Sequence, residues 1–90
     1  MELSNSSKYA IRLLSYMANN EDEEKLLNAK NMADALEIPY KFSTRIMSTL
    51  VKAGFILSLR GRVGGVKLAK KPSEITIMEI INLFNDFIKD

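Results

Sequence analysis

Five polar side chains in the middle of the chain recur at a spacing that could bind an anionic surface. They are Lys41, Thr44, Arg45, Ser48 and Lys52, and on a helix the offsets of 3, 4, 7 and 11 residues place them on one face. Arginine can pair bidentately with a guanine edge, and serine or threonine hydroxyls can bond to bases or phosphates. We therefore expect Arg45 to pair with a base, Thr44 and Ser48 to bond to bases or phosphates, and Lys41 and Lys52 to contact phosphates.

The basic residues are concentrated in one stretch. Residues 38–72 contain eight bases and no acid, whereas residues 21–37 contain six acids and two bases, although the whole chain carries only +2. A block of this length without a carboxylate favours a polyanionic partner. A solvated face that happens to be basic is the alternative. The eight bases are Lys41, Arg45, Lys52, Arg60, Arg62, Lys67, Lys70 and Lys71.

The composition excludes several other classes of site. The chain has no cysteine and no histidine, which rules out disulfides, zinc sites on those ligands, and thiol or imidazole catalysis within these residues. Its carboxylates, lysines and tyrosines are not set against a recognisable base or metal partner, so we do not expect an enzyme. Ninety residues predict one small domain. Because neither a membrane-spanning run nor a signal peptide is evident, we expect a cytoplasmic protein.

Apolar periodicity predicts three helices in the first half of the chain. They cover about residues 6–19, 29–36 and 39–53, with Asn28 as an N-cap of the second and Gly54 at the end of the third. In the third helix we expect the apolar residues Phe42, Ile46, Met47 and Leu50 to face inward.

A hairpin and a fourth helix follow. Residues 55–60 alternate, which predicts a strand with Phe55, Leu57 and Leu59 on its inner face, and residues 66–68 return after a glycine-rich turn. Thr76 and Glu79 resemble a capping box that opens the fourth helix. That helix is apolar over much of its circumference, so it needs a second surface to cover it. Its apolar residues are Ile77, Ile80, Ile81, Leu83, Phe84, Phe87 and Ile88.

This order of elements predicts the fold class: mainly α with a small β-hairpin wing, a winged helix-turn-helix. Residues 1–74 would form the DNA-binding domain, and residues 75–90 would begin a C-terminal helix that leads to a dimerisation helix. The wing brings Arg60, Gly61 and Arg62 to a backbone or minor groove. The remaining candidate DNA contacts are Ser4, Lys8, Asn28, Lys30, Tyr40 and Phe42.

Several segments resemble the Rrf2 family of bacterial regulators over nearly the whole chain. The most specific segment is the wing, residues 60–69, which reads Arg-Gly-Arg-Val-Gly-Gly-Val-Lys-Leu-Ala. Residues 3–4, 9–10, 33–38, 41–42, 46–48, 52–56 and 72–81 also match. The chain departs from the family pattern at Thr44-Arg45, where a Glu-Gln pair is common, at Ser6-Ser7 before Lys8, and at Arg62-Val63, where the wing usually has a proline.

The resemblance implies a homodimer that binds pseudo-palindromic operators, with Leu83, Phe84, Phe87 and Ile88 as the dimer interface. Many members hold an iron–sulfur cluster on three cysteines of a later region, whereas others respond to a partner protein or a metabolite. We expect no cofactor in this chain, because a cluster would need cysteines beyond residue 90. The resulting hypothesis is a sequence-specific transcriptional regulator, most simply a repressor. The alternative is a winged helix used for protein–protein contact without an operator.

Overall fold

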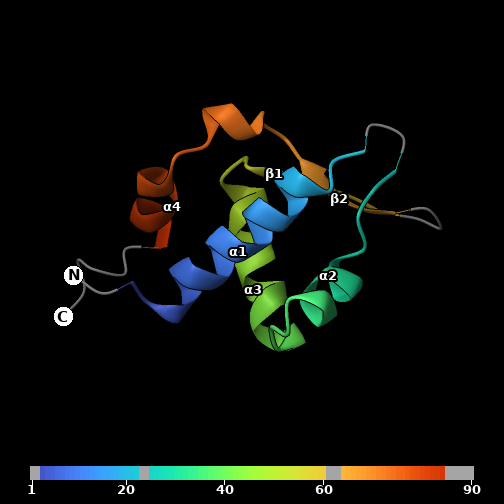
Figure 1. The fold of residues 1–90 in the computed structure, drawn as a ribbon, viewed down its shortest axis with the longest axis horizontal. Helices are drawn as coiled ribbons and strands as arrows, with labels where there is room; N and C mark the ends of the chain where they lie inside the picture. Colours follow the sequence, from blue (N-terminus) through green and yellow to red (C-terminus); the bar gives the residue numbers. More distant parts are fainter. Residues whose placement is uncertain (1–2, 23–24, 61–63, 85–90) are drawn as a thin grey trace.

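A computed structural model describes residues 3–22, 25–60 and 64–84, and Figure 1 shows their arrangement. Three helices, α1 (Asn5–Asn19), α2 (Ala29–Ala35) and α3 (Tyr40–Lys52), precede a hairpin of β1 (Ile56–Leu59) and β2 (Gly65–Leu68). A short 3-10 turn, η1 (Pro72–Glu74), then leads to α4 (Ile77–Phe84). The hairpin and α4 lie at opposite ends of the long axis. The predicted winged-helix order is confirmed.

The core forms where α1 crosses α3. The apolar stripe predicted for α1 is buried, and its Leu13 and Met17 belong to the same buried cluster as Leu50 of α3 and Met32 of α2. Truncation of such a buried side chain typically costs about 2–5 kcal/mol of unfolding free energy. Ser4 caps α1, because its Oγ accepts a hydrogen bond from the Ser7 backbone N–H at 3.3 Å. None of the helices in the described ranges is long and apolar enough to cross a membrane.

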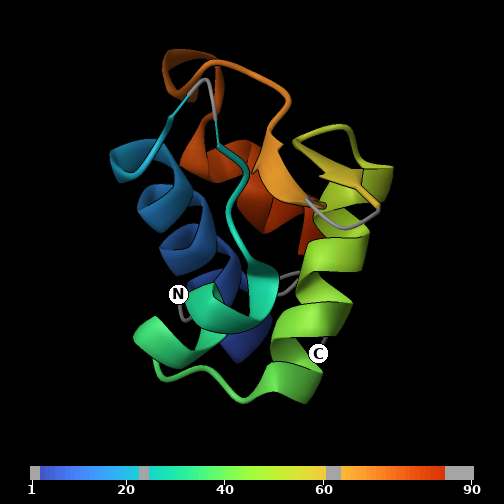
Figure 2. The same cartoon turned by 90° about the vertical axis from the view of Figure 1, so that its right-hand side faces the viewer.

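The turn between α2 and α3 fixes the angle of the helix-turn-helix (Figure 2). Asn28 caps α2 by accepting a hydrogen bond from the Asn31 N–H at 2.9 Å, as predicted. Glu37 follows α2 with φ of 56°, a left-handed conformation that turns the chain sharply. The Arg12 guanidinium donates to the Leu36 carbonyl at the end of α2, so α1 holds the turn directly. Sequence patterns gave no sign of that last contact.

One expectation for α3 is wrong. Phe42 does not face inward but is 47% exposed, whereas Ser43 is 1% exposed and takes the buried position beside Ile46, Met47 and Leu50. Helical geometry explains why Phe42 is exposed. The buried stripe of α3 is formed by residues 43, 46, 47 and 50, and Phe42, although four residues before Ile46, lies to one side of it. Instead of entering the core, Phe42 contacts Tyr9 of α1, with ring centroids 6.4 Å apart.

The inner face of the hairpin is also not the predicted one. Ile56 is buried and pairs with the buried Leu68, whereas Leu57 and Leu59 are 46% and 49% exposed on the outer face. Phe55 is buried because it closes the end of α3, where its N–H donates to the Leu50 carbonyl at 3.0 Å. The strand begins at Ile56, so the burial of Phe55 does not define its inner face, and Ile56 rather than Leu57 faces the core.

The segment before α2 adds a third row to the hairpin. Leu27 and Val66 exchange two backbone hydrogen bonds of 2.9 and 2.8 Å. Gly54 ends α3 with φ of 87°, as its predicted role at the helix terminus requires. The wing is thus attached to the body through both α3 and the chain before α2.

The helix α4 packs mainly on α1. Thr76 and Glu79 form the predicted capping box, with hydrogen bonds of 3.0 and 3.1 Å between each backbone N–H and the other side chain. Ile80 and Ile81 are buried, but Ile77, expected on the same stripe, is 57% exposed in the first turn of α4. Phe87 and Ile88 lie outside the described residues.

Candidate nucleic-acid interface

The exposed face of α3 carries the predicted set of polar side chains. Lys41, Thr44, Arg45, Ser48 and Lys52 are all exposed, on the side of the helix opposite its buried stripe. Within the described ranges no carboxylate lies within ion-pair distance of the three cations. The Thr44 hydroxyl donates to the Tyr40 carbonyl at 2.7 Å, which leaves its oxygen lone pairs facing outward as acceptors.

A groove separates α3 from the wing and continues this basic face. It encloses about 570 Å³, and its rim carries two cations, Lys52 on α3 and Arg60 at the end of β1. Ser58 lies between them on the inner face of the hairpin, because its register partner Val66 is buried on that face. The groove is lined by Ala29, Tyr40, Ser43, Thr44, Met47, Ser48, Val51, Lys52, Ser58, Arg60 and Val66.

Ser58 was missed by the sequence reasoning. The signal was available, since Ile56, Ser58 and Arg60 alternate on one face, but the apolar residues of the other face were assigned to the interior. The corrected register places Arg60 on the α3 side of the wing rather than on its back. Gly61 and Arg62 lie outside the described residues.

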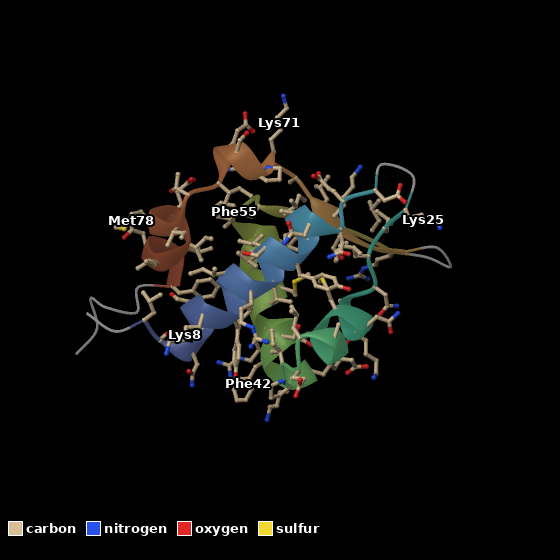
Figure 3. The ribbon with its side chains drawn as sticks, in the orientation of Figure 1. Lys8, Lys25, Phe42, Phe55, Lys71 and Met78 are labelled. Atoms are coloured by element: carbon tan, nitrogen blue, oxygen red, sulfur yellow. The ribbon has the colours of Figure 1, made fainter. Side chains whose placement is uncertain are left out.

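Two helix starts lie at the edges of this surface. Lys8 on α1 and Phe42 on α3 are found along the lower edge of the view in Figure 3, where both helices begin. Ser4 and Asn28 use their side-chain oxygens as caps, so their first role is structural. Lys30 pairs with Asp34 at 3.2 Å, and both side chains are more than 60% exposed, which offsets part of its charge.

The rest of the basic block points elsewhere. Lys70 lies 3.9 Å from Glu79 and 4.5 Å from the centre of the Phe55 ring, so it helps to join the hairpin to α4. Lys67 is exposed beside Leu57 on the outer face of the hairpin. Lys71 lies at the top of Figure 3, at the far side of the molecule from Phe42. The structure thus places Lys41, Arg45 and Lys52 on the exposed face of α3, with Arg60 across the groove from Lys52.

The geometry suits insertion of α3 into a major groove. A major groove is about 12 Å wide and admits one helix. With α3 in the groove, Arg45 and Ser48 would point toward base edges, and the inner face of the wing would lie along the adjacent backbone. The described residues contain no cluster of three potential metal ligands. Iron–sulfur clusters are held mainly by cysteine thiolates, so the residues of this chain do not fit such a group.

Comparisons with known proteins agree with this geometry. The family model for Rrf2, described as an iron-dependent transcriptional regulator, matches residues 3–89. The regulator NsrR of Geobacillus kaustophilus is 40% identical over 81 residues, which cover 90% of this chain and 54% of that protein. The chain therefore spans about half the length of that curated relative.

Solved structures show the same fold. CymR, the global cysteine regulator of B. subtilis, superposes with a TM-score of 0.84 at 25% identity, covering 92% of this chain and 64% of CymR. IscR of T. potens gives a TM-score of 0.85 at 24% identity and covers all of this chain and 65% of IscR. NsrR is named as an HTH-type transcriptional regulator and CymR as a regulator. The chain belongs to the Rrf2 family of transcriptional regulators.

Proposed function

We propose that the chain binds double-stranded DNA in a sequence-specific manner and regulates transcription. The observation that carries this proposal is the exposed face of α3, which is free of acids and continues across a groove to Arg60 on the wing. Solvated protein surfaces usually mix charges of both signs. A face with cations and hydroxyls only is suited to phosphates and base edges.

The residues divide into two roles. Arg45 would read a guanine, with Thr44 and Ser48 bonding to neighbouring bases or phosphates. Lys41, Lys52 and Arg60 would hold the backbone on either side, and Ser58 adds a hydroxyl in the groove. Further contacts with the DNA backbone would come from the starts of α1 and α2, from the exposed aromatic residues at the start of α3, and from the wing turn. These residues are Ser4, Lys8, Asn28, Lys30, Tyr40, Phe42, Gly61 and Arg62.

We further propose that it acts as a homodimer in the cytoplasm, where its DNA target is found. Leu83 and Phe84 are half-buried, and together with Phe87 and Ile88 they would meet the same residues of a second copy. Two copies would then place their α3 helices on half-sites about one DNA turn apart. Repression is the proposed mode, because occupancy of an operator is itself enough to block a promoter.

We also propose that the 90 residues bind DNA without a metal or cofactor. The description of the family as iron-dependent applies to the family model. The chain itself offers neither thiolates nor imidazoles. Any response to iron would then have to act through groups that this chain does not contain.

A second candidate is a protein–protein module. It is favoured by Ile77 and Met78, which are 57% and 56% exposed at the start of α4. Gel shifts against genomic fragments separate the two functions. Retention of particular fragments, with competition by the same fragment but not by an unrelated one, supports the regulator. Failure to retain any fragment at low salt contradicts it.

The roles within α3 are tested by two variants that each remove one positive charge. Arg45→Gln should lose about 1–3 kcal/mol of binding free energy on the retained fragment and should relax base preference. Lys71→Gln, on the far side of the molecule, should bind like the wild type. Equal losses in both variants would show that net charge alone, and not the face of α3, drives binding.

A further inference from the structure

A second opening lies on the other side of α3, away from the wing. It encloses about 270 Å³ between α1, α3 and α4. This corresponds to roughly nine water molecules, at about 30 Å³ each in the liquid. Its lining residues are Asn5, Ser6 and Tyr9 of α1, Phe42, Arg45, Ile46 and Thr49 of α3, and Phe84 of α4.

The lining combines aromatic walls with a single cation. Tyr9 and Phe42 are in contact, with ring centroids 6.4 Å apart and planes inclined at 34°. Phe84 contributes a third ring from α4. Among the described residues of the lining Arg45 alone is charged, and no described carboxylate lies within ion-pair distance of it. The described part of the cavity therefore combines three aromatic walls with the polar side chains Asn5, Ser6 and Thr49 and one unmatched positive charge.

We propose that this cavity binds a small monocarboxylate with an aromatic or similarly flat apolar body. The guanidinium of Arg45 matches a carboxylate through two parallel hydrogen bonds. The rings of Tyr9, Phe42 and Phe84 would pack against the body of the ligand. A dianion fits less well, because Arg45 is the one cation that the described lining offers and the second charge would be left unpaired.

The position of Arg45 gives the site a regulatory consequence, which rests on the proposed function. The same side chain is exposed on the face of α3 that would read DNA. A guanidinium that is paired with a carboxylate in the cavity is no longer available to a guanine. The ligand and DNA would therefore compete for Arg45, and the ligand would act as an inducer.

Binding is tested first without DNA, so that the outcome does not depend on operator binding. The 90-residue protein is titrated with sodium benzoate while the NMR signals of the aromatic rings and of the arginine side chains are followed. We expect saturable shifts of Tyr9, Phe42, Phe84 and Arg45, with a dissociation constant on the order of 1 mM for so small a probe. Benzamide, which has the same shape without the charge, should bind at least about tenfold more weakly.

Variants locate the site. Arg45→Gln should weaken benzoate binding about tenfold or more, whereas Lys71→Gln, which removes a charge outside the cavity, should leave it unchanged. Phe84→Leu, which alters a wall but keeps Arg45, should weaken it to a smaller extent, and circular dichroism confirms that each variant is folded. Absence of shifts up to tens of millimolar benzoate, or equal binding of benzamide, would overturn the proposal. Shifts of Tyr9 and Arg45 that depend on protein concentration alone would also overturn it, since these residues are not in the proposed dimer interface and a second copy would then fill the cavity.

The regulatory arm adds a DNA fragment retained in the gel shifts. Benzoate at saturation should weaken binding of the wild type by about tenfold and leave the residual binding of Arg45→Gln unchanged. Benzoate binding to the free protein without any effect on DNA affinity would retain the site and refute the competition. If no fragment is retained, the titration of the free protein still decides whether the cavity binds carboxylates.

Discussion

Replacement of Gly65 by alanine should loosen the wing from the body of the protein. A Cβ at this position would lie 2.5 Å from the Leu27 carbonyl oxygen and 2.8 Å from the Leu26 Cβ. Both distances are too short for atoms that are not bonded, and the nearer atom belongs to the backbone. The segment that contains Leu27 would have to move away from β2.

That movement breaks the two backbone hydrogen bonds between Leu27 and Val66, of 2.9 and 2.8 Å. Each such bond contributes about 0.5–1.5 kcal/mol, so the free energy of unfolding should fall by about 1–3 kcal/mol. For a domain of this size the thermal midpoint should fall by roughly 5–20 °C. Thermal unfolding followed by circular dichroism measures the change directly.

Lys67→Ala is the matched control on the same strand, because the Lys67 side chain is exposed and its removal leaves the backbone in place. It should unfold within about 0.5 kcal/mol of the wild type. A Gly65→Ala variant that melts within about 2 °C of the wild type would refute the reasoning. The wing would then not depend on its attachment to the segment before α2.

Three further outcomes follow from the same structure. Asn28→Ala should lower the free energy of unfolding by about 1 kcal/mol, because the Asn31 N–H loses its hydrogen-bond acceptor at the start of α2. Asn28→Asp should keep this cap but weaken DNA binding, because it places a negative charge at the start of α2. Equal DNA affinity of Asn28→Asp and the wild type would remove α2 from the interface. The pKa of Glu79 is held below its usual value, first by the Thr76 backbone N–H, then by the Thr76 hydroxyl, and also by Lys70. The ionised Glu79 carboxylate therefore stabilises the fold at pH values above its usual pKa, and this contribution is lost as the pH falls through the lowered pKa of the folded protein. On acidification, the urea midpoint of unfolding should drop more in the wild type than in Glu79→Gln. Parallel curves of urea midpoint against pH for the two proteins would contradict this. Chelator treatment should change neither the thermal midpoint nor the DNA affinity of the chain, and a loss of either on addition of EDTA would contradict metal-independent binding.

The helices could be predicted from sequence because each has one apolar face and a recognisable start. Ser4, Asn28 and the Thr76–Glu79 pair all act as caps in the structure. The polar face of α3 followed from the same periodicity, since five side chains at helical spacing share one side whatever the helix packs against. The order of elements then left few folds other than a winged helix.

The hairpin shows where sequence reasoning failed. Both of its faces carry apolar residues, so alternation defined the period but not the inner side. The answer depends on tertiary packing: Phe55 is used to close α3, and Ile56 is the residue that meets Leu68 in the core. The bond from Arg12 to Leu36 and the cavity beside Arg45 likewise depend on how helices distant in sequence cross, which no local pattern encodes.

The central claim is that the face of α3 reads DNA sequence. Its most direct test is selection of duplexes from a fragmented genome, followed by measurement of affinity for a selected and a scrambled duplex across a range of salt concentrations. The account predicts that the selected duplex binds tighter by on the order of a thousandfold, that binding to both weakens steeply with salt, and that Arg45→Gln reduces the difference between the two duplexes by about 5- to 150-fold. Equal affinity for the two duplexes, or a preference that Arg45→Gln leaves intact, would contradict it.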